Sequence, residues 1–130
     1  MFAAASRILK QEGPALEAIH RLFAYYQEMA VDNKPLGCLI ANSQGQFLKS
    51  DTDLTEILSG QMGVLTRSLE SAIKRGKKQG DIDPGLNART TAWMLAALAT
   101  GILVGMRTWM SAAYVKDINL AISYLLRREE

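Results

Sequence analysis

The chain has 130 residues, the size of one ordinary globular domain. Hydrophobic residues make up 48% and charged residues 22%, which excludes an intrinsically disordered chain. The formal net charge of +2 is too small to drive nucleic-acid binding by itself. The single cysteine, Cys38, excludes an internal disulfide, and the N-terminal residues do not resemble a signal peptide. Both observations favour a cytoplasmic protein.

The first part of the chain predicts three helical segments. Apolar residues at helical spacing predict a short helix from Phe2 to Glu12, which Gly13 ends. Pro14 suits the first position of a second, amphipathic helix that runs to Ala30. We also expect a helix over Leu36 to Leu48, although two glycines weaken it.

The second part predicts three further helices. A long apolar stripe begins at Leu54 and continues to Ile73, and Gly80 suits the residue just after the end of that helix. Asn87 is a suitable cap for the next helix, and a last helix is expected from Ala112 to Arg127. No segment alternates apolar and polar residues as a strand does. The sequence therefore predicts an all-α bundle of about six helices in a single domain.

One of these helices carries no charge at all between Arg89 and Arg107. A helix that is apolar on every side must be covered on every side, and a chain of this size is too small to do so alone. The run sits near the lower limit of about 17 residues for a membrane span, and its many small residues dilute it. Ala97, Gly101 and Gly105 instead form one face that lets another helix approach closely. We therefore expect a second copy of the chain, and no membrane, to cover this helix.

The order of these elements resembles the C-terminal regulatory domain of TetR/AcrR-type transcriptional repressors. The resemblance rests on two pieces of sequence: Gly37-Cys38-Leu39-Ile40, and the block from Leu69 to Val104. In that block a basic helix end, the turn around Asp83-Pro84 and an apolar helix with an internal Gly101 follow one another. The matching order extends from Pro14 to Leu126.

The resemblance implies an effector-binding and dimerisation domain over residues 13–130. Its last two long helices would pair with those of a second subunit as a four-helix bundle, giving a homodimer. The other helices would surround a small apolar or amphipathic effector of a repressor. Residues 1–12 would link this domain to an N-terminal helix-turn-helix domain, which is expected to be missing here and through which operator DNA would be bound.

Two sets of residues are candidates for these roles. Broad, polarisable side chains suit an apolar ligand, although for each of them taken singly a place in the core is the more common explanation. The candidate effector-binding residues are Phe23, Tyr26, Met29, Met62, Leu65, Trp93 and Met94. The candidate dimer-interface residues are Ala97, Gly101, Gly105, Trp109, Val115, Ile118, Ile122 and Leu125.

The sequence offers no motif of enzyme chemistry. It contains no nucleophile elbow, no phosphate-binding loop and no pair of carboxylates in an apolar setting. No cluster of metal ligands appears, so we expect neither a metal nor a cofactor. An alternative function is a free-standing helical dimerisation module that has no effector.

Overall fold

The computed structural model describes residues 2–32, 52–108 and 110–127, and these residues form five helices. They are α1 (Phe2–Leu9), α2 (Ala15–Asp32), α4 (Thr52–Gln79), α5 (Ala88–Thr108) and α6 (Ala112–Leu126). The described residues contain no strand, which confirms the predicted all-α fold. The helix predicted over Leu36 to Leu48, including Cys38, lies outside the described residues.

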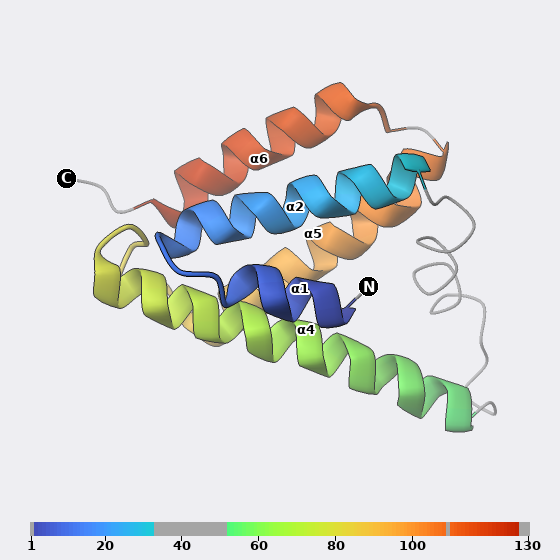
Figure 1. Ribbon diagram of the computed structural model, residues 1–130, viewed down its shortest axis with the longest axis horizontal. Helices are drawn as coiled ribbons and strands as arrows, with labels where there is room; N and C mark the ends of the chain where they lie inside the picture. The colour runs from blue at the N-terminus through green and yellow to red at the C-terminus, as the bar shows by residue number, and fades with distance from the viewer. Residues whose placement is uncertain (1, 33–51, 109, 128–130) are drawn as a thin grey trace.

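Helix α2 lies at the centre of the bundle. It packs against α1, α4, α5 and α6, and Figure 1 shows α6 and α4 on opposite sides of it, with α5 passing behind. Its apolar residues recur at the helical period, and the stripe they form is completely buried. The buried stripe consists of Ala15, Ala18, Ile19, Leu22, Phe23 and Tyr26.

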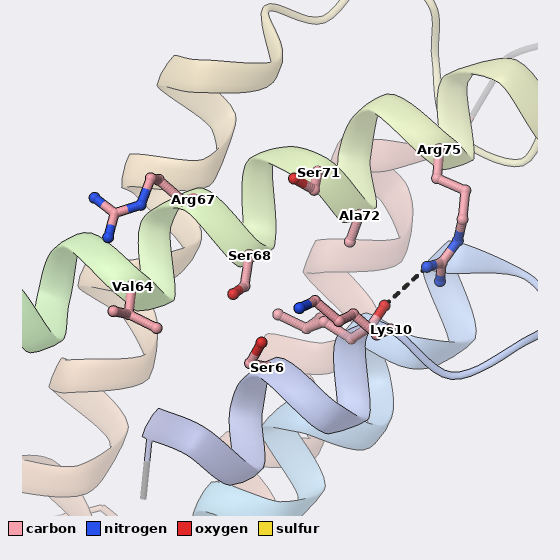
Figure 2. A pocket seen from close by; sticks show the side chains of 9 residues that line it. Ser6, Lys10, Val64, Arg67, Ser68, Ser71, Ala72 and Arg75 are labelled. Atoms are coloured by element: carbon pink, nitrogen blue, oxygen red, sulfur yellow. Dashed lines mark hydrogen bonds between the residues drawn. The ribbon is translucent and has the colours of Figure 1, made fainter.

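Helix α1 is shorter than the predicted helix from Phe2 to Glu12. It ends at Leu9, which is also the last residue of its apolar pattern, and a side chain of α4 caps it there. The Nη1 of Arg75 donates a hydrogen bond of 2.9 Å to the carbonyl oxygen of Leu9 (Figure 2). This satisfies a carbonyl group that the helix leaves unpaired at its C-terminus. The chain then turns at Gly13, whose φ of 109° is readily adopted only by glycine.

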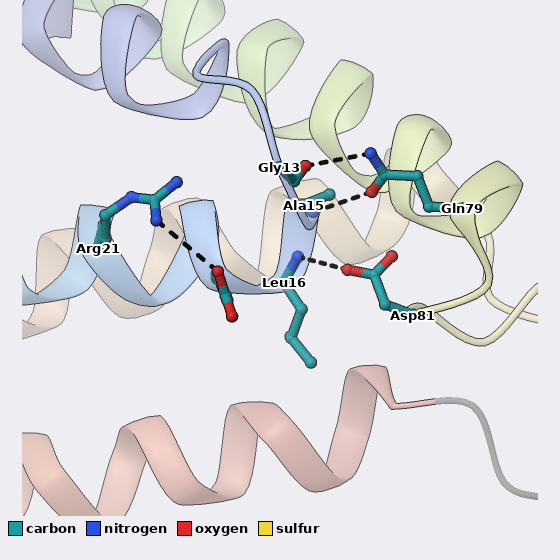
Figure 3. Close-up of polar contacts among 7 residues, drawn as sticks. Gly13, Ala15, Leu16, Arg21, Gln79 and Asp81 are labelled. Carbon is teal, nitrogen blue, oxygen red and sulfur yellow. Dashed lines mark hydrogen bonds and ion pairs between the residues drawn. The ribbon is translucent and has the colours of Figure 1, made fainter.

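The beginning of α2 is held by side chains from the end of α4 (Figure 3). The Oε1 of Gln79 accepts from the backbone N–H of Ala15 at 3.0 Å, and the Oδ2 of Asp81 accepts from that of Leu16 at 3.0 Å. The Nε2 of Gln79 donates to the carbonyl oxygen of Gly13 at 3.1 Å. Two N–H groups that an isolated helix would leave unpaired are thus satisfied by tertiary contacts.

The end of α4 follows the sequence prediction. Gly80 has a φ of 90° and donates from its N–H to the carbonyl oxygen of Gly76 at 3.0 Å, which confirms its place just after the helix. Gly76 itself allows close packing at this junction. A Cβ atom there would lie 2.7 Å from Cγ1 of the buried Ile82 and 3.1 Å from Cβ of Ala15.

Helix α5 begins as predicted, since the Oδ1 of Asn87 accepts from the backbone N–H of Thr90 at 3.0 Å. It packs against α2 and α4 through one side, on which the described residues Ala92, Leu95, Ala99 and Ile102 are buried. None of the described helices is long and apolar enough to span a bilayer.

Helix α6 packs mainly on α2 and is fastened there by polar contacts. His20 on α2 hydrogen-bonds through Nδ1 to the Oδ1 of Asn119 at 3.2 Å and through Nε2 to the Oγ of Ser123 at 2.8 Å. At the C-terminal end of α6, the N–H of Asp83 donates to the carbonyl oxygen of Leu126 at 2.7 Å. These contacts fix which side of α6 faces the bundle.

Candidate functional site

The outer sides of α5 and α6 carry most of the apolar surface that the described chain leaves uncovered. Of the seven large hydrophobic side chains exposed among the described residues, six belong to these two helices. They are Trp93, Met94, Tyr114, Leu120, Tyr124 and Leu125, and Tyr124 is 74% exposed. Large apolar side chains that remain exposed are typical of surfaces that bind a partner.

Helix α5 is covered on one side only. Ala97 and Gly101 lie on its exposed side, where a Cβ atom at Gly101 would meet nothing within 4 Å. Gly105 is instead buried, and a Cβ atom there would lie 3.3 Å from Cβ of Met110 in the same chain. Of the three small residues of the predicted face, Ala97 and Gly101 are therefore exposed, whereas Gly105 packs against a residue of its own chain.

The predicted interface residues of α6 are divided in the same way. Val115 and Ile122 are completely buried against the core of their own chain, and Ile118 is half-buried beside it. This packing leaves Val115 and Ile122 no exposed area for a second subunit in this conformation. Leu125 is 53% exposed and remains available, whereas Trp109 lies outside the described residues.

The predicted effector-binding residues lie in three different environments. Phe23, Tyr26 and Leu65 are fully buried in the core. A place in the core was the alternative explanation for their apolar character. Met29 is half-buried near the end of α2, and Met94 lies on the exposed side of α5. Only Met62 and Trp93 come together, in a groove between α4 and α5.

This α4–α5 groove has a volume of about 430 Å³, which is within the range of small-molecule sites. Met62 and Thr66 line it from α4, and Trp93, Ala96, Ala97 and Thr100 line it from α5. The guanidinium carbon of Arg89 lies 4.9 Å from the centre of the Trp93 ring, so a cation covers one face of that ring.

The polar groups of the groove are the hydroxyls of two threonines. Thr66 Oγ1 donates to the carbonyl oxygen of Met62, and Thr100 Oγ1 donates to that of Ala96 at 3.1 Å. Each hydroxyl has a single proton, which is used within its own helix, so its lone pairs remain for a ligand. The groove can therefore accept hydrogen bonds from a ligand that is mostly apolar.

The sequence did not single out Thr66 and Thr100. Both lie within long helices, where threonine has no distinctive pattern of its own. Their juxtaposition depends on how α4 and α5 are aligned, which is a long-range property of the fold. The signal that identified Met62 and Trp93 was side-chain type, and it selected Phe23 and Leu65 equally.

The described residues contain no group of three or more His, Cys, Asp or Glu side chains that could hold a metal ion. Tyr26 is the one buried tyrosine of the described core, and its hydroxyl has no hydrogen-bond partner among the described residues. Burial, and to a smaller extent the neighbouring Tyr25, raise the pKa of the Tyr26 phenol far above its ordinary value.

Comparison with protein-family models identifies a match. The model of the tetracyclin repressor-like C-terminal domain matches residues 15–121, from the start of α2 well into α6. Comparisons with curated proteins and with solved structures find no match. Domains of this family are regulatory rather than catalytic, and they serve ligand binding and dimerisation. With most of its length matched, the chain belongs to the family of tetracyclin repressor-like C-terminal domains.

Proposed function

We propose that this domain senses a small apolar or amphipathic effector for a TetR-like repressor and dimerises through the outer sides of α5 and α6. The observation that carries the proposal is the concentration of exposed large hydrophobic residues on these two helices. Leu120 and Tyr124 take the place of Val115 and Ile122 in the predicted interface, beside Leu125, which was predicted. A homodimer brings the same surface from two chains together, as most symmetric dimers do.

The α4–α5 groove is the proposed effector site. Its lining is mainly apolar, and its two threonine hydroxyls favour a ligand that donates through an N–H or O–H group. Trp93 and Ala97 line the groove and also belong to the exposed side of α5. A bound ligand and a second subunit would therefore contact the same helix, so each would influence the binding of the other.

Helix α1 is the proposed connection to a helix-turn-helix domain, and operator DNA is the proposed partner of that domain. Helix α1 packs against both α2 and α4, so a shift of α4 around a bound effector would move α1 directly. Transcriptional regulation places such a protein in the cytoplasm.

The oligomeric state tests the first half of the proposal. We expect sedimentation equilibrium, without detergent, to give a mass about twice the 14.3 kDa of one chain. A dilution series gives the dissociation constant. A chain that remains monomeric at high concentration contradicts the proposed role of α5 and α6.

Ligand binding tests the second half. The neutral probe N-phenyl-1-naphthylamine offers two aromatic groups and one N–H donor, and its fluorescence rises in an apolar site. We expect Thr100→Val to weaken its binding by about fivefold, because a hydrogen bond contributes roughly 1 kcal/mol. Thr90→Val is the matched control on the same helix, since Thr90 is exposed and does not line the groove.

Equal losses in both threonine variants, or no saturable binding, would contradict the groove as the effector site. A dimer that binds no probe would instead favour the free-standing dimerisation module. The two experiments thus separate association from sensing.

A further inference from the structure

Helix α4 is attached to the rest of the bundle unevenly along its length. From Gly60 to Lys74, its described side chains make hydrogen bonds and ion pairs only within their own helix. Over this stretch α4 is held mainly by a buried apolar stripe. The stripe consists of Leu65, Leu69, Ala72 and Ile73. Apolar contacts have no preferred direction, whereas a hydrogen bond weakens steeply when its angle changes, so this stretch can shift at a lower cost.

The C-terminal end of α4 and the turn after it are held instead by hydrogen bonds to other parts of the chain. Figure 3 shows Gln79 and Asp81 bonded to the beginning of α2. Figure 2 shows Arg75 bonded to the end of α1. The Nζ of Lys77 donates to the carbonyl oxygen of Leu86, just before α5, at 2.6 Å. We call these four polar side chains, from Arg75 to Asp81, the α4 clamp.

Close packing reinforces the clamp. A Cβ atom at Gly76 would lie 2.7 Å from Cγ1 of Ile82, which is completely buried, so the turn after α4 lies directly against the helix. The N–H of Asp83 joins the same turn to the last carbonyl oxygen of α6. In Figure 1, the beginning of α2, the end of α4 and the end of α6 lie at the same end of the bundle.

We propose that the α4 clamp is a fixed pivot about which the rest of α4 tilts. The stretch from Gly60 to Lys74 is then a movable arm, and the α4–α5 groove lies along it. Met62 and Thr66 line the groove about 13–20 Å from Arg75 along the helix axis, at roughly 1.5 Å per residue. A ligand that separates the arm from α5 would therefore rotate α4 and leave its clamped end in place. This coupling to an effector rests on the proposed function, whereas the pivot itself does not.

The same tilt would act unequally on the two ends of α1. Its last carbonyl group is bonded to Arg75 in the clamp, whereas Ser6 lies beside Val64 and Ser68 of the arm (Figure 2). The first turn of α1 would therefore move with the arm, and its last turn would stay with the clamp. The clamp thus converts a displacement at the groove into a rotation of two helices.

Electron–electron resonance between two spin labels tests the pivot without any ligand. One label is placed by Ala24→Cys on α2, and the second by Gln61→Cys on the arm or by Lys78→Cys at the clamp. All three positions are exposed, and Cys38→Ser removes the natural thiol. An excess of unlabelled chain removes distances between subunits. We expect a wider distance distribution for the pair at Gln61 than for the pair at Lys78.

The probe N-phenyl-1-naphthylamine tests the coupling to the groove. At saturation, the distance between Ala24 and Gln61 should change by about 1–2 Å, which is the usual size of a helix shift. The distance between Ala24 and Lys78 should stay constant. Absence of probe binding contradicts the effector groove, and the two distributions of the free chain then decide on the pivot alone.

Substitutions in the clamp locate the pivot. Gln79→Ala together with Asp81→Ala removes the acceptors at the beginning of α2, so the distribution at Lys78 should become as wide as the one at Gln61. Asp81→Asn is the control, because its amide oxygen can still accept from the N–H of Leu16. Circular dichroism should show unchanged helix content in both variants.

Three results overturn the proposal. One is equal widths at the arm and at the clamp in the original chain, which also decides the case if the double variant does not fold. Another is a folded double variant whose distribution at Lys78 stays narrow. The last is a bound probe that moves both positions by the same amount, because α4 would then shift as a whole.

Discussion

Helices α2 and α6 are both rich in apolar residues, yet the chain covers one of them far more completely than the other. The apolar stripe of α2 is enclosed by α1, α4, α5 and α6. On α6, Val115, Ile122 and Leu126 are buried, while Leu120, Tyr124 and Leu125 remain more than half exposed on the other side. The comparison shows where one chain completes its own core and where its apolar surface exceeds what it can bury.

The largest expected effect comes from substitutions on the exposed side of α6. The double variant Leu120→Glu with Tyr124→Glu places two charges on the exposed side of α6 without touching its buried side. If this side is a dimer interface, the dissociation constant should rise by about a thousandfold, because central interface side chains contribute roughly 2 kcal/mol each. Sedimentation velocity over a dilution series measures the change, and circular dichroism should show unchanged helix content.

The control for this variant is Val64→Glu. Val64 is the remaining exposed large hydrophobic residue of the described chain and lies on α4, away from α5 and α6. It should leave the dissociation constant within about twofold of the original value. A similar loss of association in both variants would show that general hydrophobicity, and not the side of α6, drives dimer formation.

The next largest effect concerns the buried junction between the beginning of α2 and the end of α4. Gly76→Ala introduces a methyl group into the space between Ile82 and Ala15, so we expect the free energy of unfolding to fall by about 1–2 kcal/mol. Gly60→Ala on the same helix meets nothing within 4 Å and should raise it by up to about 1 kcal/mol through helix propensity. Urea unfolding measures both changes.

The pair of glycine variants has opposite expected signs, which makes the result easy to interpret. Both substitutions add the same atom to the same helix, so their difference reports on packing alone. A stabilising Gly76→Ala would mean that Ile82 moves aside readily and that the junction is less tightly packed than its distances indicate.

The sequence predicted which residues end a helix better than it predicted which distant residues contact those ends. Gly80 and Asn87 are confirmed as helix-end residues because a left-handed φ and an Asn cap depend on a few adjacent residues. Helix α1 ends at Leu9, where its apolar pattern also ends, and the predicted extension to Glu12 does not form. The carbonyl of Leu9 pairs with Arg75, 66 residues away. Such a contact leaves no trace in local periodicity.

The candidate sites were less predictable for the same reason. Val115, Ile122 and Leu125 share one helical pattern, and the pattern does not state which of them meets α2 and which remains exposed. Met62 and Trp93 were selected by side-chain type, but the groove that joins them exists only because α4 packs on α5. The excess of apolar surface on the uncharged helix, by contrast, was visible from the sequence, because it depends on composition and size.

The smallest expected effect concerns the hydroxyl of Tyr26 inside the enclosed region. Because this buried group lacks a partner among the described residues, Tyr26→Phe should leave stability at pH 7 unchanged or raise it by up to about 1 kcal/mol. Tyr25→Phe is the control, since Tyr25 is the adjacent tyrosine and is only half-buried. Urea unfolding at pH 7 measures both.

The same pair of variants makes a prediction at alkaline pH. Burial raises the pKa of Tyr26 above its ordinary value of 10.0, so the folded chain holds the phenolic proton more tightly than the unfolded chain does. The contribution of this group is complete below pH 10.0 and is lost as the pH rises above it, because the unfolded chain then ionises first. Tyr26→Phe should therefore lose less stability than Tyr25→Phe between pH 7 and about pH 10.5. Equal losses in the two variants would mean that the Tyr26 phenol ionises as readily as an exposed one, which is inconsistent with a side chain enclosed by the bundle.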